Sequence, residues 1–227
     1  MLIKDWEDLP FAMRNEMVKP YYDSLQRKKI SLFCKFLFDK TAALCLLIFL
    51  SPLFVIFALL IKLDSEGDIF FRQVRVTRYG EKYIIYKFRT MVKNAEALGS
   101  QVTNNHDKRI TRVGKKLRCL RLDELPQLIN ILKGEMSFVG TRPEVIRYFE
   151  KYTDEMMATL LLPAGVTSEA CIKYKDEEKL IGEGPDVDEK YINEVLPGKM
   201  QLNLESLLKF SFLNDLLTMI KTVIAVI

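Results

Sequence analysis

The stretch TAALCLLIFLSPLFVIFALLI, from Thr41 to Ile61, decides which kinds of fold this chain can adopt. It carries no charged side chain over about 20 residues, which is enough to cross the hydrocarbon core of a bilayer. It begins too far from Met1, and has the wrong flanking residues, to be a cleaved signal peptide. The stretch therefore predicts a helix embedded in a membrane.

Two features argue against a simple crossing. Ser51-Pro52 stands in the middle, where a proline removes one backbone hydrogen bond and bends or breaks a helix, and a neighbouring serine hydroxyl can satisfy the freed carbonyl. Basic residues stand on both sides, which under the positive-inside rule favours two cytoplasmic ends. These residues alone leave two alternatives open, a kinked span and a helix that turns and returns to the same face. The basic residues are Arg27, Lys28, Lys29, Lys35 and Lys40 before the stretch and Lys62, Arg72, Arg75 and Arg78 after it.

The composition limits the classes of protein that fit the chain. Its 227 residues make one medium domain, or a domain with an anchor. A net charge of +4 suits phosphates or an inner-leaflet surface, but no basic stripe with interleaved aromatics is present, so we expect no nucleic-acid binding. The four cysteines form no CxxC pair and His106 is the one histidine, so we expect reduced thiols and no zinc site. The cysteines are Cys34, Cys45, Cys119 and Cys171.

The remaining chain predicts a small domain of helices with one β-hairpin. Two runs rich in aromatic and β-branched residues flank a short turn and indicate the hairpin strands, Ile69–Val76 and Lys82–Phe88. Leu202–Ile227 has apolar residues at helical spacing and predicts an amphipathic helix pair that packs on the domain or lies in the membrane interface. Asp39 is expected to cap the N-terminal end of the membrane segment or to interact with its helix dipole. The other expectations are polar loops at Ala95–His106 and Lys175–Glu189, the latter with a short helix, and helices at Thr111–Leu120, Pro126–Leu132 and Asp154–Leu162.

The candidate chemistry lies in LDELP, residues 122–126. Side chains at adjacent positions of a helix do not face each other, so Asp123 and Glu124 can hold different roles. One carboxylate could attack a phosphorus atom and the other could bind Mg²⁺, while Arg118 and Arg142 hold phosphate oxygens. The simpler alternative is that the acidic pair stabilises a helix dipole, by about 0.3–1 kcal/mol.

Longer motifs around this pair resemble the bacterial sugar transferase family, the small monotopic phosphoglycosyl transferases. The motifs are KFRTM (87–91), DKRITRVGKKLRCLRLDELPQLINILKGEMSFVGTRPE (107–144) and LPAGVTS (162–168), together with FDK and SPLF in the apolar segment. The resemblance covers roughly residues 33–222. It implies transfer of a sugar phosphate from a UDP-sugar to undecaprenyl phosphate, with release of UMP, through a phosphosugar-aspartate intermediate.

The resemblance also implies roles for individual residues. Asp123 would be the nucleophile and Glu124 the Mg²⁺ ligand. Arg118 and Arg142 fall on basic positions near the substrate phosphates, and further phosphate-binding candidates are Lys87 and Arg89. Ser51 and Pro52 match the family's helix break, which favours the re-entrant alternative.

The expected fold is therefore α+β and mostly helical. It has an N-terminal extension (1–32), a re-entrant membrane helix broken at Ser-Pro (33–63), and a cytosolic catalytic domain with a β-hairpin and interfacial amphipathic helices (64–227). The expected location is the cytoplasmic face of a bacterial inner membrane, in contact with its lipids. The extension lies outside the family pattern and could serve membrane docking or homo-oligomerisation.

The sequence departs from the family pattern at two places, and two other functions are open as alternatives. Thr141 stands where many family members have proline, and LPAGVTSEA replaces a commoner PGITG run, so the contacts of that turn are open. The first rival is a membrane-anchored scaffold without activity. The second is a glycosyl transferase that moves the sugar alone and releases UDP. No residue set that reads the sugar ring is evident.

Overall fold

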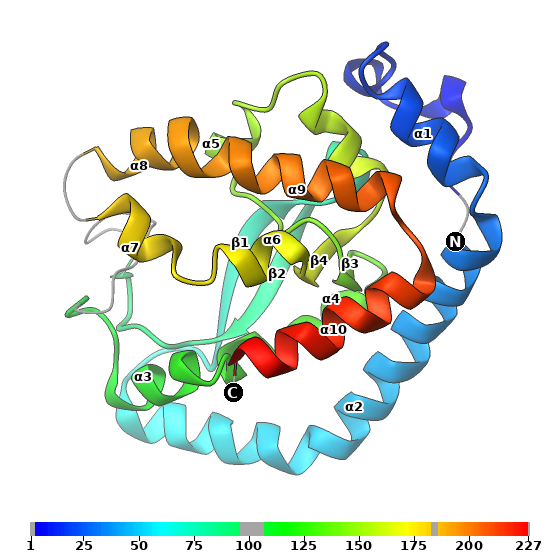
Figure 1. The fold of residues 1–227 in the computed structure, drawn as a ribbon. Helices are drawn as coiled ribbons and strands as arrows, with labels where there is room; N and C mark the ends of the chain where they lie inside the picture. The colour runs from blue at the N-terminus through cyan, green and yellow to red at the C-terminus, as the bar shows by residue number, and fades with distance from the viewer. Residues whose placement is uncertain (1–2, 96–106, 183–185, 227) are drawn as a thin grey trace.

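The membrane segment lies within α2, Lys29–Asp64, a single helix of 36 residues in the computed structural model. The structure describes residues 3–95, 107–182 and 186–226. Helical conformation continues through Ser51 and Pro52, and the Ser51 hydroxyl donates to the Ile48 carbonyl at 2.8 Å. That carbonyl is the group that Pro52, which has no N–H, leaves without a helical partner. Figure 1 shows α2 running down one side of the molecule and then along its base, so the expected break is a bend inside one continuous helix.

Both arms of α2 are attached to the body of the protein, by which we mean the described residues after Asp64. In the first arm, Lys40 Nζ donates to the Ile131 carbonyl at 2.9 Å, and Asp39 accepts from the Phe138 N–H at 3.2 Å. At the far end, Asp64 Oδ2 accepts from the Val113 N–H at 2.9 Å. Asp39 lies inside the helix, so the prediction that it caps the helix is wrong.

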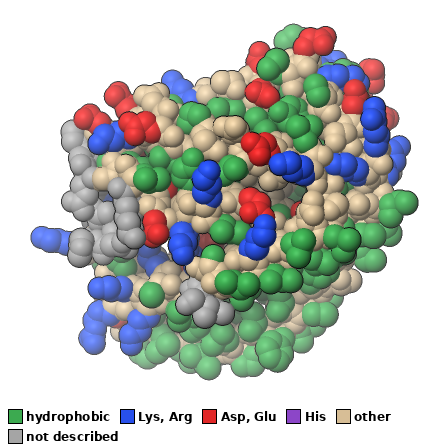
Figure 2. All heavy atoms as spheres, viewed as in Figure 1, with side chains coloured by type: hydrophobic (Ala, Val, Ile, Leu, Met, Phe, Trp, Pro, Cys, Tyr) green, Lys and Arg blue, Asp and Glu red, His purple; other side chains and the backbone are tan. Residues whose placement is uncertain are grey.

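The surface of α2 between these attachments is apolar and exposed. By length and composition alone, α2 is apolar enough to cross a membrane, with a mean hydropathy of 3.0 over its most apolar 18 residues. Only 6% of that window is buried, whereas the core helix of a water-soluble protein is mostly buried. Figure 2 shows the resulting apolar base of the molecule. The exposed side chains there include Leu44, Leu46, Ile48, Phe49, Val55, Ile56, Leu59, Leu60 and Leu63.

The predicted β-hairpin is confirmed as β1, Phe70–Val76, and β2, Lys82–Phe88. The strands are antiparallel, and the register pairs Arg75 with Tyr83 and Phe71 with Lys87. Because side chains alternate between the faces of a strand, Arg75, Tyr83 and Lys87 lie on one face of the hairpin. That face is turned towards the candidate site.

A second, parallel two-stranded sheet was not predicted. It pairs β3, Met136–Val139, with β4, Ala164–Thr167, and the loop that follows β3 carries Arg142. The two strands continue into a close contact of glycine backbones. A Cβ atom on Gly165 would lie 2.2 Å from the Gly140 nitrogen, so no larger residue fits without moving the loop.

The helices of the body follow the sequence expectations in part. The predicted helices before and after LDELP are confirmed as α3, Arg112–Cys119, and α4, Gln127–Lys133, and α4 ends at the left-handed Gly134. The expected helix at Asp154–Leu162 is a 3-10 helix, η6, Met156–Leu161. The expected C-terminal pair is confirmed as α9, Leu196–Leu208, and α10, Phe212–Val226. The short elements are α5 (Ile146–Phe149), α6 (Glu169–Lys173), α7 (Glu177–Ile181), α8 (Val187–Lys190) and the π-helical turn η7 (Tyr191–Val195). The predicted loop at 96–106 lies outside the described residues.

The C-terminal helix α10 lies beside α2 (Figure 1) and is amphipathic. A buried ion pair joins the two helices, with Lys35 Nζ 2.6 Å from Asp215 Oδ2 and 2.7 Å from the Val139 carbonyl. The opposite face of α10 is apolar and exposed, and it continues the apolar surface of α2. Its exposed side chains are Leu213, Leu217, Ile220, Val223 and Ile224.

The part of the N-terminal extension that precedes α2, residues 3–28, packs into the main core. It includes the helix α1, Lys19–Gln26. Met13, Val18 and Leu25 are fully buried in a cluster shared with η6, α9 and the residues just after α9. The extension is therefore packed into the core of the body and is not an appendage.

Candidate active site

The acidic pair lies on η5, Leu122–Glu124, a short 3-10 helix between α3 and α4. Arg121 precedes it in the left-handed conformation, with φ 56°, and turns the chain sharply after α3. This turn places Asp123 in the interior, with 7% of its surface exposed. The two acidic side chains then have different neighbours, as their adjacency in the sequence predicts.

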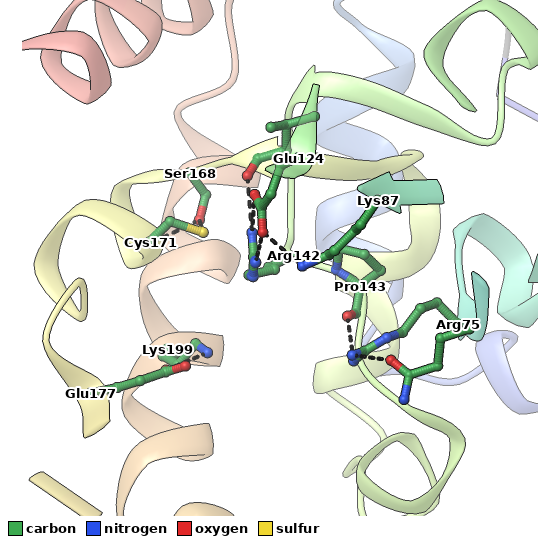
Figure 3. A network of polar contacts seen from close by, with 11 residues as sticks. Arg75, Lys87, Glu124, Arg142, Pro143, Ser168, Cys171, Glu177 and Lys199 are labelled. Atoms are coloured by element: carbon green, nitrogen blue, oxygen red, sulfur yellow. Dashed lines mark hydrogen bonds and ion pairs between the residues drawn. The ribbon is translucent and has the colours of Figure 1, made fainter. Parts of the chain in front are cut away.

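Glu124 is held by two cations from two other parts of the fold. Lys87 Nζ, from β2, lies 2.8 Å from Oε1. Arg142, from the loop after β3, donates Nη2 to Oε1 at 2.5 Å and Nη1 to Oε2 at 3.2 Å. Figure 3 shows these side chains converging on the carboxylate.

These contacts fix the charge of Glu124. Burial by itself would raise the pKa of Glu124, but Arg142 and Lys87 outweigh burial and hold that pKa well below its usual range. The same carboxylate raises the pKa of Arg142. Glu124 is therefore an anion locked between two cations.

Asp123 has a different environment. No hydrogen bond or ion pair to its side chain occurs within the described ranges. Burial, followed by the charge of Glu124, raises the pKa of Asp123, while Lys87, Arg118 and Arg142 oppose that rise. A buried carboxylate without a direct partner, surrounded by cations, keeps an oxygen free to react with an electrophile that carries negative charge.

The predicted basic residues do not all join this cluster. Lys87 and Arg142 contact Glu124 directly, whereas Arg118 on α3 is half-buried and acts on Asp123 only through its charge. Arg89 lies elsewhere. Its guanidinium donates to the Ser65 carbonyl at 2.6 Å and the Ile61 carbonyl at 3.4 Å, at the C-terminal end of α2. In this structure Arg89 therefore contacts the end of α2 and is not among the groups around Glu124, and its assignment to the substrate phosphates stays a prediction.

The structure adds Arg75, which the sequence analysis counted only as a flanking charge. This buried guanidinium donates to the Pro143 carbonyl at 3.2 Å and to Gln73 Oε1 at 2.6 Å (Figure 3). Burial lowers the pKa of Arg75, and no carboxylate of the described chain pairs with it. The contact with Pro143 supports the backbone beside Arg142. The alternation of the hairpin, which puts Arg75 on the same face as Lys87, is the signal that could have found it.

The loop that carries Arg142 is held at further points. Tyr191 donates its hydroxyl to Glu144 Oε1 at 2.6 Å, and the Val166 carbonyl lies 3.4 Å from Arg142 Nη1. The second contact comes from the turn at 162–168, whose role the sequence left open. Its last residue, Ser168, caps α6 by accepting from the Cys171 N–H at 3.2 Å.

Asp123 and Glu124 are the candidate protein ligands for Mg²⁺. No group of three or more potential protein ligands is found in the part of the chain that the structure describes. Mg²⁺ commonly takes one or two carboxylates and completes its shell with water and substrate phosphates. Asp123 and Glu124 would supply carboxylates to a metal held jointly with a phosphorylated substrate, and among the described residues they form no complete cage of their own.

Comparison with known proteins places this arrangement in a family. The profile of the bacterial sugar transferase family matches residues 30–227. The chain therefore belongs to the bacterial sugar transferase family. The match begins at residue 30, near the end of the predicted extension, although most of the extension that precedes it shares the core.

Three relatives illustrate the range of the family. A protein of Aeromonas hydrophila, named UDP-N-acetylgalactosamine-undecaprenyl-phosphate N-acetylgalactosaminephosphotransferase, is 36% identical over 203 residues, which is 88% of this chain and 45% of that protein. The uncharacterized sugar transferase EpsL of Bacillus subtilis is 36% identical over 142 residues, 63% of this chain and 69% of EpsL. The undecaprenyl-phosphate galactose phosphotransferase of Salmonella typhimurium is 34% identical over 175 residues, 70% of this chain and 37% of that protein. The chain thus spans less than half the length of the first and third relatives.

Proposed function

We propose that this protein is a phosphoglycosyl transferase that moves a sugar-1-phosphate from a UDP-sugar to undecaprenyl phosphate. The observation that carries the proposal is the different state of the two adjacent carboxylates. Glu124 is locked as an anion by Lys87 and Arg142, while Asp123 is buried beside the same cations and has no hydrogen-bond partner among the described residues. Family membership and the printed names of the relatives support the same reaction.

In the first proposed step, an Asp123 oxygen attacks the phosphorus that bears the sugar. A new P–O bond forms to Asp123 while the bond to the bridging oxygen breaks, and UMP leaves with that electron pair. In the second step, an oxygen of undecaprenyl phosphate attacks the same phosphorus and the Asp123 carboxylate is released. The products are undecaprenyl-diphosphate sugar and UMP, and the side chain of Asp123 is regenerated.

The cations supply the electrostatic part of this proposal. Phosphoryl transfer depends mainly on positioning and on neutralising the charge of the phosphate oxygens. Arg142 has the planar fork that binds phosphate in a bidentate manner, and Arg118 adds positive charge near Asp123. Mg²⁺, when bound by Glu124 and the substrate phosphates, would neutralise charge on the departing UMP.

Arg75 is proposed as a positioning residue, and this gives a prediction. Arg75→Met removes the donor to Pro143, so Arg142 loses part of its support and kcat/KM for UMP release should fall by roughly tenfold to a hundredfold. Arg75→Lys keeps a donor and should recover part of the loss. Steady-state kinetics of the two variants provide the measurement. Equal activity of Arg75→Met and wild type would remove Arg75 from the site.

We propose further that α2 is re-entrant in the cytoplasmic face of the inner membrane. Pro52 lies twelve residues from Lys40 and twelve from Asp64, and these two residues are bound to the same body. Each arm of the bent helix is therefore about 18 Å long, against a hydrocarbon core of about 30 Å. A helix tied at both ends to one body, with arms of this length, reaches into one leaflet and returns.

Labelling of single cysteines tests this topology. In a background without the native cysteines, Ser31→Cys and Ser65→Cys lie on either side of the apolar stretch 41–61, and Phe49→Cys lies near the bend. A membrane-impermeant maleimide should react at positions 31 and 65 in inverted inner-membrane vesicles, and at neither position in intact spheroplasts. Position 49 should be protected in both. Reaction of positions 31 and 65 from opposite faces would show that α2 crosses the membrane.

Nucleotide release tests the reaction itself. The detergent-solubilised protein is incubated with Mg²⁺, undecaprenyl phosphate and a panel of UDP-sugars that includes UDP-N-acetylgalactosamine and UDP-galactose. Release of UMP with one donor supports phosphoglycosyl transfer and identifies the sugar. Release of UDP would instead support a glycosyl transferase, and the absence of turnover together with binding of the substrates would support a scaffold.

A further inference from the structure

Both oxygens of the carboxylate that the proposed function assigns to the metal already accept hydrogen bonds from cations in this structure. Oε1 of Glu124 accepts from both Lys87 at 2.8 Å and Arg142 at 2.5 Å, and Oε2 accepts from Arg142 at 3.2 Å. The Glu124 side chain is only 10% exposed, so solvent offers little access from another direction. The ion pairs with Lys87 and Arg142 therefore restrict the access of a metal ion to Glu124.

A divalent cation cannot simply join this arrangement. Mg²⁺ binds carboxylate oxygen at 2.0–2.1 Å and requires near-octahedral geometry. At Oε1 it would stand next to an ammonium and a guanidinium that occupy the same oxygen, and like charges at this separation repel strongly in a buried site. Metal binding therefore requires that at least one of the two cations first leaves Glu124.

The phosphate groups of a bound substrate would offer Lys87 and Arg142 alternative acceptors. Their side chains are more exposed than that of Glu124, at 20% for Lys87 and 29% for Arg142, so both reach the open side of the site. The guanidinium fork that now holds a carboxylate matches a phosphate group equally well. A diphosphate offers acceptors for both cations at once, and it also supplies oxygen ligands for the metal.

We propose that a nucleoside diphosphate opens the metal site by drawing Lys87 and Arg142 away from Glu124. This inference rests on the proposed function, because it takes the Glu124 site and its substrate class from there. Nucleotide and metal then bind with positive cooperativity, and by linkage each raises the affinity for the other by the same factor. Lys87 and Arg142 have two roles, closing the carboxylate before the substrate arrives and binding its phosphates afterwards.

Mn²⁺ binding to the full-length protein in detergent tests the proposal without turnover. The enhancement of water-proton relaxation reports Mn²⁺ that is bound to the protein, and UDP serves as the nucleotide. For wild type we expect saturating UDP to tighten Mn²⁺ binding by at least about tenfold, a coupling within the range common between linked sites. Equal Mn²⁺ affinity with and without UDP would overturn the proposal.

Single substitutions show whether the ion pairs of Glu124 hinder metal binding, as opposed to a general loss of structure. Lys87→Gln removes one of the closing cations and should tighten Mn²⁺ binding in the absence of UDP, whereas Lys87→Arg keeps the charge and should bind as weakly as wild type. Glu124→Gln should abolish the UDP-dependent binding. Lys133→Gln, at an exposed lysine that contacts Tyr86, serves as the matched control and should behave as wild type. An unchanged UDP-free affinity in a folded Lys87→Gln protein would show that the ion pair does not close the site.

The two proposals can fail separately. If UMP is released but Mn²⁺ binding is independent of UDP, the reaction stands and the closure is wrong. If UDP and Mn²⁺ bind cooperatively but no donor yields UMP, the closure stands and the reaction is wrong. Thermal unfolding of each variant provides the check on folding.

Discussion

Asp123→Asn is expected to lower UMP release by at least about a thousandfold, the scale seen when an enzyme loses its nucleophile. The amide has the size of the carboxylate but cannot attack phosphorus. Because the side chain of Asp123 has no hydrogen-bond partner among the described residues, the substitution breaks no contact in the fold. Binding of the UDP-sugar should survive, because Lys87 and Arg142 remain in place.

The stability of the same variant distinguishes a catalytic from a structural role. Burial and Glu124 raise the pKa of Asp123 above its unfolded value, so at neutral pH the charged form costs folding free energy. Asparagine removes that charge, and the melting temperature should stay equal to wild type or rise. A structural aspartate would show the opposite change.

Covalent labelling completes this test. Wild type incubated with a sugar-labelled UDP-sugar, without undecaprenyl phosphate, should retain the label after denaturation, and Asp123→Asn should not. Asp23→Asn, which removes one partner of an exposed ion pair with Lys19, is the control and should be labelled normally. Turnover of Asp123→Asn within tenfold of wild type would exclude the covalent route.

Leu25→Ala is expected to destabilise the protein by about 2–5 kcal/mol, although residue 25 lies outside the family match. Leu25 has no exposed surface and packs in the cluster shared with η6 and α9. For a chain of this size the loss corresponds to a fall in melting temperature of roughly 4–20 °C. Deletion of residues 3–26 removes two further fully buried side chains, Met13 and Val18, and should prevent isolation of a folded protein.

Phe11→Ala provides the matched control for this prediction. Phe11 belongs to the same extension but is 86% exposed, so its loss should change stability by no more than about 0.5 kcal/mol. Thermal unfolding in detergent measures both variants. If Leu25→Ala unfolds at the wild-type temperature, the extension does not contribute to the core as the structure indicates.

The elements that could be predicted are those with a local signal. Local patterns indicate the apolar run of α2, the alternating side chains of the hairpin and the end of α4 at Gly134. The sheet of β3 and β4 could not be predicted, because four-residue strands pair across a separation of 28 residues and carry no pattern of their own. The role of the extension was missed for the same reason, since the parts of its buried cluster that come from η6 and α9 lie more than 130 residues further along.

Some features of the candidate site could likewise be predicted from the sequence and others could not. Adjacency alone indicated that Asp123 and Glu124 differ, and the family motif indicated Lys87 and Arg142. The sequence could not show that Lys87 and Arg142 both bind Glu124 and not Asp123, because this depends on how η5 packs against the loop after β3. The position of Arg89 in KFRTM also does not reveal that its side chain turns towards α2, away from Glu124.

The attachment of both α2 arms to one body also affects how the protein responds to its membrane. A helix that crosses a bilayer must match the thickness of the hydrocarbon layer, and a mismatch is relieved by tilt or by lipid deformation. In the proposed re-entrant topology, arms of about 18 Å start and finish at the same membrane surface and do not reach the far boundary, so no such match is imposed. The height of Asp123 relative to the near headgroups is then set by the protein alone. We expect this protein to tolerate lipids of different chain length with little change in rate, provided that the near surface is preserved.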